Sequence, residues 1–122
     1  MIFTDARGSL LSCRRFSDLP FAPKSFFVVY DVPANTIRGR HAHFENKQYL
    51  ICGAGRIRVA LENGDGKREV FLNAGDSLFH DSMEWGEFEF LTGKDMLISV
   101  CSEEYDEADY IRDYDRFKTL IG

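Results

Sequence analysis

Short runs of β-branched and aromatic residues, separated by turns that contain glycine or asparagine, recur along most of this sequence. Residues 56–61 alternate polar and apolar side chains, which is typical of a strand with one buried and one solvated face. Residues 62–67 contain an Asn-Gly and an Asp-Gly pair, and residues 68–72 resume the strand pattern, so this segment predicts a β-hairpin. Short strands at regular spacing predict an all-β sandwich or barrel rather than a parallel α/β sheet.

The strand pattern extends to both sides of this hairpin, and the two ends of the chain differ from it. Residues 25–32 are almost wholly apolar and predict a buried strand. The first 23 residues contain Gly8 and two prolines and are expected to form short strands or arms. Further strands are expected at residues 48–52, 77–80, 87–91 and 96–101. A short closing helix or set of turns is expected where apolar residues fall at helical spacing, at Tyr110, Tyr114, Phe117 and Ile121.

Length, charge and cysteine content bound the class of protein. With 122 residues the chain is long enough for one hydrophobic core, so we expect one domain over residues 1–122. The net charge of −5 argues against nucleic-acid and membrane-surface partners, because both attract proteins through a positive field. No run approaches the ~20 apolar residues of a membrane span. Cys13, Cys52 and Cys101 form no CxxC pair, so we expect a cytoplasmic protein without a disulfide framework or zinc knuckle.

The titratable chemistry of the chain is concentrated in the stretch Arg38-Gly39-Arg40-His41-Ala42-His43. His41 and His43 are two residues apart, so in an extended segment both imidazoles project from the same face. Such a pair binds a metal ion, transfers protons, or has neither role. Arg38 and Arg40 beside them form either a local basic site for an anionic ligand or ordinary solvated surface.

The histidine spacing also resembles the first motif of the cupin superfamily, in which Gly39-x-His41-x-His43 is followed by a polar residue, Gln48. In metal-binding cupins a glutamate and a third histidine complete the metal shell. Here Gln48 occupies the glutamate position and Gly86 occupies the position of the third histidine. Because a neutral amide is a poor ligand for a divalent ion and glycine offers none, we expect no bound catalytic metal.

The chain as a whole resembles the dTDP-4-oxo-6-deoxyglucose 3,4-ketoisomerases, small metal-free cupins of deoxysugar biosynthesis. The resemblance implies a cupin jelly-roll β-barrel with a short C-terminal helical or turn segment. It also implies that no cofactor is needed and that the protein is a homodimer with exchanged N-terminal strands. It is carried by Asp5-x-Arg7-Gly8-x-Leu10, by Arg38-Gly39-x-His41-Ala42-His43 with Gln48, and by the tail Tyr105-Asp106-Glu107-x-Asp109-Tyr110-Ile111-Arg112-Asp113-Tyr114-Asp115-x-Phe117.

The resemblance implies an isomerase that moves the ketone from C4 to C3 of a dTDP-linked 4-oxo-6-deoxyhexose through an enediolate. Imidazole suits this work because its ordinary pKa lies near neutrality. The family motif makes His41 and His43 the catalytic pair and leaves open which one is the base. Arg38 would place a forked donor against the substrate or its diphosphate, and Arg40 stands at the variable position of the motif. Gln48 would orient a histidine or the substrate.

Three residues outside the motif are further candidates. Tyr30 either hydrogen-bonds the sugar during catalysis or is a core tyrosine, and Trp85 either offers a flat face to the thymine or sugar ring or is core. The chain departs from the family pattern where an aromatic-Ile-Pro-Pro segment leading into Trp-His is expected. It has Phe79-His80-Asp81-Ser82 leading into Trp85-Gly86 instead. His80 is therefore either a structural residue or a substrate-binding residue that replaces the missing histidine from a different strand.

Two other function classes are compatible with the same sequence. One is a non-catalytic cupin that binds a sugar nucleotide, which the changes at His80 and Gly86 favour. The other is a metal-dependent cupin oxygenase, which would require a bound metal. The stereochemistry of the product at C4 and the downstream aminotransferase do not follow from the sequence.

Overall fold

A computed structural model describes residues 1–12 and 16–122. The prediction for Cys13 lies outside the described residues, whereas Cys52 and Cys101 are buried free thiols. The helical segments are η1 (Phe16–Asp18), η2 (Glu107–Asp109) and α1 (Tyr114–Ile121). The strands are β1 (Ile2–Asp5), β2 (Gly8–Leu11), β3 (Ser25–Tyr30), β4 (Thr36–His43), β5 (Gln48–Ala54), β6 (Arg56–Asn63), β7 (Gly66–Asn73), β8 (Ser77–His80), β9 (Trp85–Phe90), β10 (Met96–Cys101) and β11 (Tyr110–Ile111).

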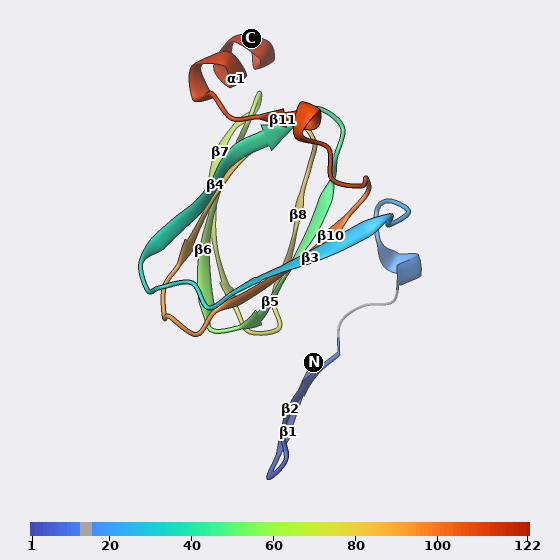
Figure 1. The fold of residues 1–122 in the computed structure, drawn as a ribbon, viewed down its shortest axis with the longest axis vertical. Helices are drawn as coiled ribbons and strands as arrows, with labels where there is room; N and C mark the ends of the chain where they lie inside the picture. Colours follow the sequence, from blue (N-terminus) through green and yellow to red (C-terminus); the bar gives the residue numbers. More distant parts are fainter. Residues whose placement is uncertain (13–15) are drawn as a thin grey trace.

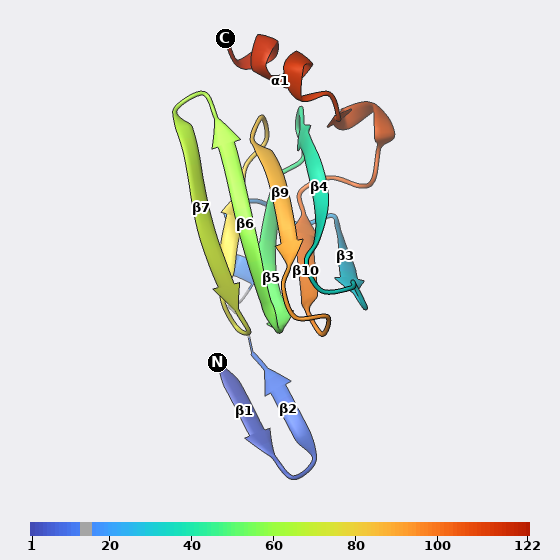
Figure 2. The same cartoon turned by 90° about the vertical axis from the view of Figure 1, so that its left-hand side faces the viewer.

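Two antiparallel sheets face each other and enclose the core (Figures 1 and 2). The smaller sheet has the strand order β3-β10-β5-β8, and the larger has the order β11-β4-β9-β6-β7. Most neighbours within a sheet are not consecutive in the chain, because the chain crosses repeatedly from one sheet to the other. This arrangement confirms the predicted all-β jelly roll. The predicted hairpin is also confirmed, since β6 and β7 pair up to Asn63 and Gly66 at their turn.

The core between the sheets is built from the inward positions of alternating strands. In β6, Ile57, Val59 and Leu61 are at most 2% exposed. Arg58, between two of them, points outward and forms a 2.8 Å ion pair with Glu89 of β9. Burial of each large apolar side chain contributes about 1.5–3 kcal/mol, so the period-two pattern of this strand fixes which face is inward.

Strand β3 is an edge strand, and the prediction that it is buried is wrong. It pairs with β10 on one side only. Phe26 is 72% exposed and Tyr30 is 61% exposed, although Val29 between them packs against the core. An apolar run does not reveal whether both faces of a strand are covered. The outward face of β3 is therefore an apolar surface that nothing in this chain covers among the described residues.

The two ends of the chain lie at opposite ends of the sandwich. Strands β1 and β2 form a separate two-stranded hairpin that extends away from the sheets (Figures 1 and 2). At the other end, α1 begins after Asp113, whose carboxylate accepts backbone N–H groups of the first turn. Phe117 anchors this helix against Trp85. The predicted closing helix is confirmed, although Tyr110 belongs to β11 instead. No helix in the described part of the chain is long and apolar enough to cross a membrane.

Asp95, just before β10, ties together the loops at one end of the sandwich. Its buried carboxylate accepts hydrogen bonds from the backbone N–H of Arg56 at 2.7 Å and from the backbone N–H and hydroxyl of Thr92 at 2.9 and 2.7 Å. Gly55 passes so close, with a φ of 75°, that a Cβ there would collide with the carboxylate. Burial alone would raise the pKa of Asp95, but these hydrogen bonds outweigh it and hold the pKa below its usual range.

We expect Asp95→Ala to lower the free energy of unfolding by about 2–4 kcal/mol at pH 7, because it leaves several buried donors without an acceptor. The native pKa of this carboxyl lies below its ordinary value of 3.8, so its contribution is present above that pH and is lost as the pH falls through the native pKa. Urea unfolding at pH 7 and near pH 3 measures the difference.

The control for this prediction is Asp65→Ala, in the exposed turn between β6 and β7. It should change the free energy of unfolding by no more than about 0.5 kcal/mol. A loss for Asp95→Ala that is as large at pH 3 as at pH 7 would contradict the role assigned to the ionised carboxylate.

Candidate active site

A β-bulge in β4 decides which side chains of the Arg-Gly-Arg-His-Ala-His stretch point inward. The pairing of β4 with β9 shifts between Gly39 and His41, and Gly39 and Arg40 both have positive φ, 88° and 58°. Strict alternation would place Arg38 on the face opposite His41 and His43. The extra residue reverses this, so Arg38 lines the same cavity as both histidines, and Arg40 points to the outer face.

The two histidines of β4 lie side by side in this cavity. Their ring centroids are 5.0 Å apart and the rings are almost perpendicular. His43 is only 2% exposed. Two of their buried nitrogen atoms, His41 Nδ1 and His43 Nε2, have no hydrogen-bond partner among the described residues. Since buried polar atoms are rarely left unpaired, these two atoms are available to pair with a group that enters the cavity.

Both imidazoles are held in the neutral form. Burial lowers the pKa of His41 to about 4 and that of His43 to about 3, because the charged ring would lose its water. The nearby Arg112 guanidinium lowers both further. At neutral pH each ring therefore carries one N–H and one lone pair, and the pair is able to accept and donate protons.

An aromatic and cationic wall from the tail covers the histidines. Strand β11 pairs with β4 so that Tyr110 lies opposite His43, and their ring centroids are 4.3 Å apart. The Arg112 guanidinium lies 4.2 Å from the centroid of the Tyr110 ring and forms hydrogen bonds of 2.7 and 2.9 Å to the Glu107 carboxylate. The hydroxyl of Tyr105 donates to the same carboxylate at 2.6 Å. This contact network fixes the position of Arg112 at the cavity.

The tail residues of this wall were not among the predicted site residues. The tail carried part of the family resemblance, but no role followed from its sequence because β11 is only two residues long. The available signal was the run of tyrosine, glutamate and arginine between residues 105 and 112, which is unusual for a simple closing helix. The missed contributors are Tyr105, Glu107, Tyr110 and Arg112.

The cavity itself lies between the two sheets and has a volume of about 630 Å³. Its floor is apolar and includes Leu50, Phe88 and Leu97. Its polar groups include the two histidines, Gln48, Arg38, Asn46 and the tail wall, together with the carboxylates of Glu103, Glu104, Asp106 and Asp109. A volume of this size is within the range of small-molecule sites, about 300–1,000 Å³.

Gln48 and His80 form a buried pair behind the histidines. The two residues lie opposite each other in β5 and β8. His80 Nδ1 lies 3.2 Å from the Gln48 amide, and His80 Nε2 lies 2.7 Å from the carbonyl oxygen of Glu84. Gln48 lines the cavity as predicted, but His80 is 1% exposed and does not line it. Of the two roles predicted for His80, its position favours the structural one, because the ring contacts the Gln48 amide and the Glu84 carbonyl oxygen.

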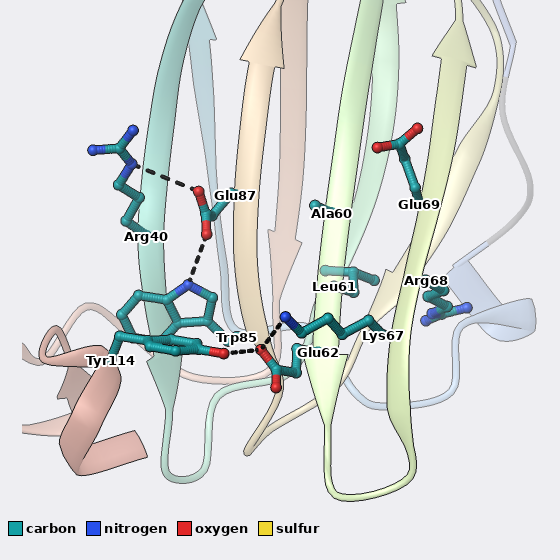
Figure 3. Close-up of a pocket in the computed structure, with 10 residues that line it drawn as sticks. All are labelled: Arg40, Ala60, Leu61, Glu62, Lys67, Arg68, Glu69, Trp85, Glu87 and Tyr114. Atoms are coloured by element: carbon teal, nitrogen blue, oxygen red, sulfur yellow. Dashed lines mark hydrogen bonds and ion pairs between the residues drawn. The ribbon is translucent and has the colours of Figure 1, made fainter. Parts of the chain in front are cut away.

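Arg40 and Trp85 do not line this cavity. The outward turn of the bulge carries Arg40 to the other face of the sheet, and Trp85 belongs to a core cluster, which was one of its two predicted roles. Arg40 Nε lies 3.6 Å from the Glu87 carboxylate, which accepts a 3.2 Å hydrogen bond from the Trp85 indole N–H (Figure 3). The Trp85 ring packs on Tyr114 and Phe117. Arg40, Glu87, Trp85 and Tyr114 line a separate groove on the outer face of the large sheet.

Tyr30 is likewise not brought to the cavity of its own chain. It is the last residue of β3 and its side chain is on the exposed face of that strand. The five preceding residues of β3, Ser25 to Val29, line the cavity, and Tyr30 does not. The structure thus gathers His41, His43, Arg38 and Gln48, and it separates Tyr30, Arg40, Trp85 and His80 from them.

The side chains at the cavity do not fit a cupin metal site. Gln48 offers a neutral amide, and Gly86 has no side chain. Within residues 1–12 and 16–122 no group of three or more histidine, cysteine, aspartate or glutamate side chains is arranged to hold a metal ion. The metal-dependent oxygenase is therefore the function class that this donor set supports least.

Comparisons with known proteins find a matching family model, a relative of similar sequence and solved structures of similar fold. The family model described as "FdtA: WxcM-like, C-terminal" matches residues 1–122. A TDP-4-oxo-6-deoxy-alpha-D-glucose-3,4-oxoisomerase of Aneurinibacillus thermoaerophilus is 34% identical over 119 residues, which cover 97% of this chain and 86% of that protein. A 3,4-ketoisomerase from Helicobacter canadensis has a TM-score of 0.85 at 32% identity, covering 99% of this chain and 92% of that one. QdtA, a sugar 3,4-ketoisomerase of Thermoanaerobacterium thermosaccharolyticum solved in complex with TDP, has a TM-score of 0.86 at 30% identity, covering 99% and 89%.

The depressed histidine pKa values predict how stability depends on pH. Between about pH 4 and pH 6.5 the unfolded state binds more protons than the native state, so stability rises with pH in this window and is lost as the pH falls. Each such group contributes a slope of up to about 1.4 kcal/mol per pH unit. We expect His43→Asn to flatten this slope in urea unfolding measured from pH 7 to pH 4.5. A histidine C2-proton signal that titrates near pH 6.5 in the native protein would contradict the burial argument.

Proposed function

This chain belongs to the family described as FdtA (WxcM-like, C-terminal), and we propose from this premise that it moves the ketone of a TDP-linked 4-oxo-6-deoxyhexose from C4 to C3. The observation that carries the proposal is the pair of neutral imidazoles, His41 and His43, with unpartnered nitrogen atoms in one cavity. The reaction only relocates protons and electrons within the sugar, so it needs no external oxidant or reductant.

The proposed path begins when one neutral imidazole takes the proton from C3. The C3–H electron pair forms the C3–C4 double bond, and the C4 carbonyl oxygen becomes the enediolate oxygen. A proton is then delivered to C4, and the C3 hydroxyl gives up its proton as C3 becomes the ketone. The low pKa values of both rings keep them neutral before reaction and make their protonated forms ready proton donors. The second imidazole moves the proton of the C3 hydroxyl to the C4 oxygen, so that C3 ends as the ketone and C4 carries a hydroxyl.

Two arginines, Arg38 and Arg112, line the cavity beside four acidic residues, Glu103, Glu104, Asp106 and Asp109, so a diphosphate would need a cation that is free to pair with it. Arg38 lines the cavity and forms no ion pair within the part of the chain that the structure describes. Arg112 is already bound to Glu107, so it is a fixed cation rather than a free one. We therefore assign Arg38 to the diphosphate, where a guanidinium makes paired hydrogen bonds to phosphate oxygens. Such a local cation resolves how a chain with a net charge of −5 binds an anionic nucleotide.

The proposed activity has a direct competitor in a sugar-nucleotide-binding protein without catalysis. The replacement of the expected histidine by Gly86 is the observation that favours it. The two proposals differ in one measurable event, the exchange of a carbon-bound hydrogen of the sugar with solvent.

We expect His43→Asn to lower turnover of TDP-4-oxo-6-deoxyglucose by about 10²–10⁴-fold, because it removes a proton-transfer group. NMR in deuterated water measures exchange of the C3 hydrogen, and calorimetry with TDP measures nucleotide binding. TDP binding should stay within about threefold in the variant, since Asn keeps a polar group of similar size at the site. Wild-type protein that binds TDP but never exchanges the C3 hydrogen would establish the non-catalytic alternative.

The same proposal includes a homodimer with exchanged N-terminal strands, in the cytoplasm. The homodimer is supported by apolar side chains that are exposed on two parts of the chain. The projecting hairpin exposes Phe3 by 55% and Leu10 by 60%, and edge strand β3 exposes Phe26 by 72%. Isolated two-stranded hairpins are only marginally stable in water, so a hairpin of this kind requires a surface to pack against. A second copy of the chain offers the matching apolar strand.

Light scattering after size exclusion should therefore give twice the 14.0 kDa mass of one chain. Leu10→Asp should weaken the dimer at least about tenfold, because it places a charge in an apolar contact. The control is Leu120→Asp, which changes a leucine of 44% exposure on α1, at the opposite end of the molecule, and should leave the mass unchanged. A monomeric wild-type protein at micromolar concentration would overturn the exchanged-strand proposal.

A further inference from the structure

The donors and acceptors of the His80–Gln48 pair decide whether the oxygen or the nitrogen of the Gln48 amide faces the cavity. The carbonyl oxygen of Glu84, 2.7 Å from His80 Nε2, can only accept. Nε2 must therefore carry the hydrogen. A neutral imidazole has only one N–H, so Nδ1 has a lone pair and needs a donor.

The other neighbour of the ring, at Nδ1, is the Gln48 amide. The Gln48 atom that lies 3.2 Å from Nδ1 is the carbonyl oxygen, Oε1. This orientation places an acceptor against the lone pair of Nδ1. A half-turn of the amide exchanges its oxygen and nitrogen, which have nearly the same shape, and restores a donor–acceptor pair. Only a doubly protonated His80 would favour the other orientation.

The surroundings of His80 keep it neutral. The ring is fully buried, with the Phe88 ring centroid 5.8 Å away and Gly86 beneath it, and burial lowers its pKa to about 4. Of the charged groups nearby, Arg68 lowers the pKa and Asp81 raises it. The Glu84 carboxylate is occupied by Asn63 and by the backbone N–H of Asp81.

We infer that His80 is a positioning residue that takes an N–H from Gln48, so that the Gln48 carbonyl oxygen faces the cavity and accepts a hydrogen bond from a hydroxyl of the bound hexose. Within residues 1–12 and 16–122, the hydrogen-bond partner at the cavity end of this amide is the Cys101 thiol, at 3.9 Å. A buried carbonyl oxygen with so weak a partner is an acceptor that a sugar hydroxyl would satisfy. The hexose contact rests on the proposed function, whereas the orientation of the amide does not.

The position of the His80 ring beside Gln48 requires a glycine at position 86. A Cβ at position 86 would lie 2.7 Å from His80 Cε1 and 2.9 Å from Phe88 Cζ, so any side chain there would displace the imidazole. The chain therefore combines a glycine in β9 with a histidine from β8. The histidine ring fills the space above the glycine, and it acts on the substrate through Gln48 rather than by touching it.

The first test measures the tautomer of His80 in ligand-free wild-type protein, by long-range proton–nitrogen NMR of the imidazoles at pH 7. The expected result is a neutral ring with hydrogen on Nε2. A ring with hydrogen on Nδ1, or a doubly protonated ring, would overturn the inferred orientation. This readout depends on neither folding of a variant nor activity.

The second test compares the affinities for TDP-glucose and TDP by calorimetry, in wild type, His80→Asn and His80→Gln. Asparagine places its side-chain oxygen where Nδ1 was, so the gain in affinity from the hexose should be kept. Glutamine places a carbon rather than a hydrogen-bond acceptor there, so this gain should fall at least about fivefold while TDP affinity is unchanged. Equal loss in both variants, or no loss in either, would overturn the positioning role. Failure of wild type to bind any TDP ligand would overturn the proposed function and the hexose contact, and the tautomer would still decide the amide orientation.

Discussion

The site depends on the alternation of side chains along a β-strand. One extra residue in β4 interrupts this alternation between Gly39 and His41. Without the bulge, a strand that presents His41 and His43 to the cavity would turn Arg38 away from it. Gly39 makes the bulge possible, because its φ of 88° and the Phe88 ring beside it leave no room for a side chain. The result is a cation and two bases on one face of a single strand, with Arg40 on the other face.

Burial then gives the two histidines their chemical character. A solvated pair of imidazoles with an ordinary pKa of 6.5 would be partly charged near neutrality and would repel each other. Enclosure by the sheet, by Tyr110 and by the fixed Arg112 makes both neutral instead. With Gln48 in place of a carboxylate, the same enclosure lacks the negative charge that a divalent ion would need. The site is therefore suited to moving protons, and its shape and its electrostatics point to the same chemistry.

Much of the fold could be predicted because it depends on local patterns. The period-two strand of residues 56–61, the Asn-Gly and Asp-Gly turn, and the closing helix around Phe117 each follow from neighbouring residues. The shared face of His41 and His43 follows in the same way. The position of β3 at a sheet edge, the bulge at Gly39 and the pairing of β11 with β4 depend on contacts distant in sequence. For that reason the sequence does not reveal that Tyr30 is exposed, that Arg40 and Trp85 lie away from the cavity, or that Tyr110 and Arg112 line it.

The pairing of Tyr110 with His43 also bears on when this protein acquires its chemistry during synthesis. The ribosome makes β4 long before β11, so a growing chain exposes both histidines without the aromatic cover that belongs beside them. Until the tail docks, their rings lack the Tyr110 cover and the Arg112 charge, which contributes to lowering their pKa. An unfinished or truncated chain would thus contain every residue of the histidine motif and still lack a working site. Completion of the last strand is the step that converts a folded sandwich into a catalyst.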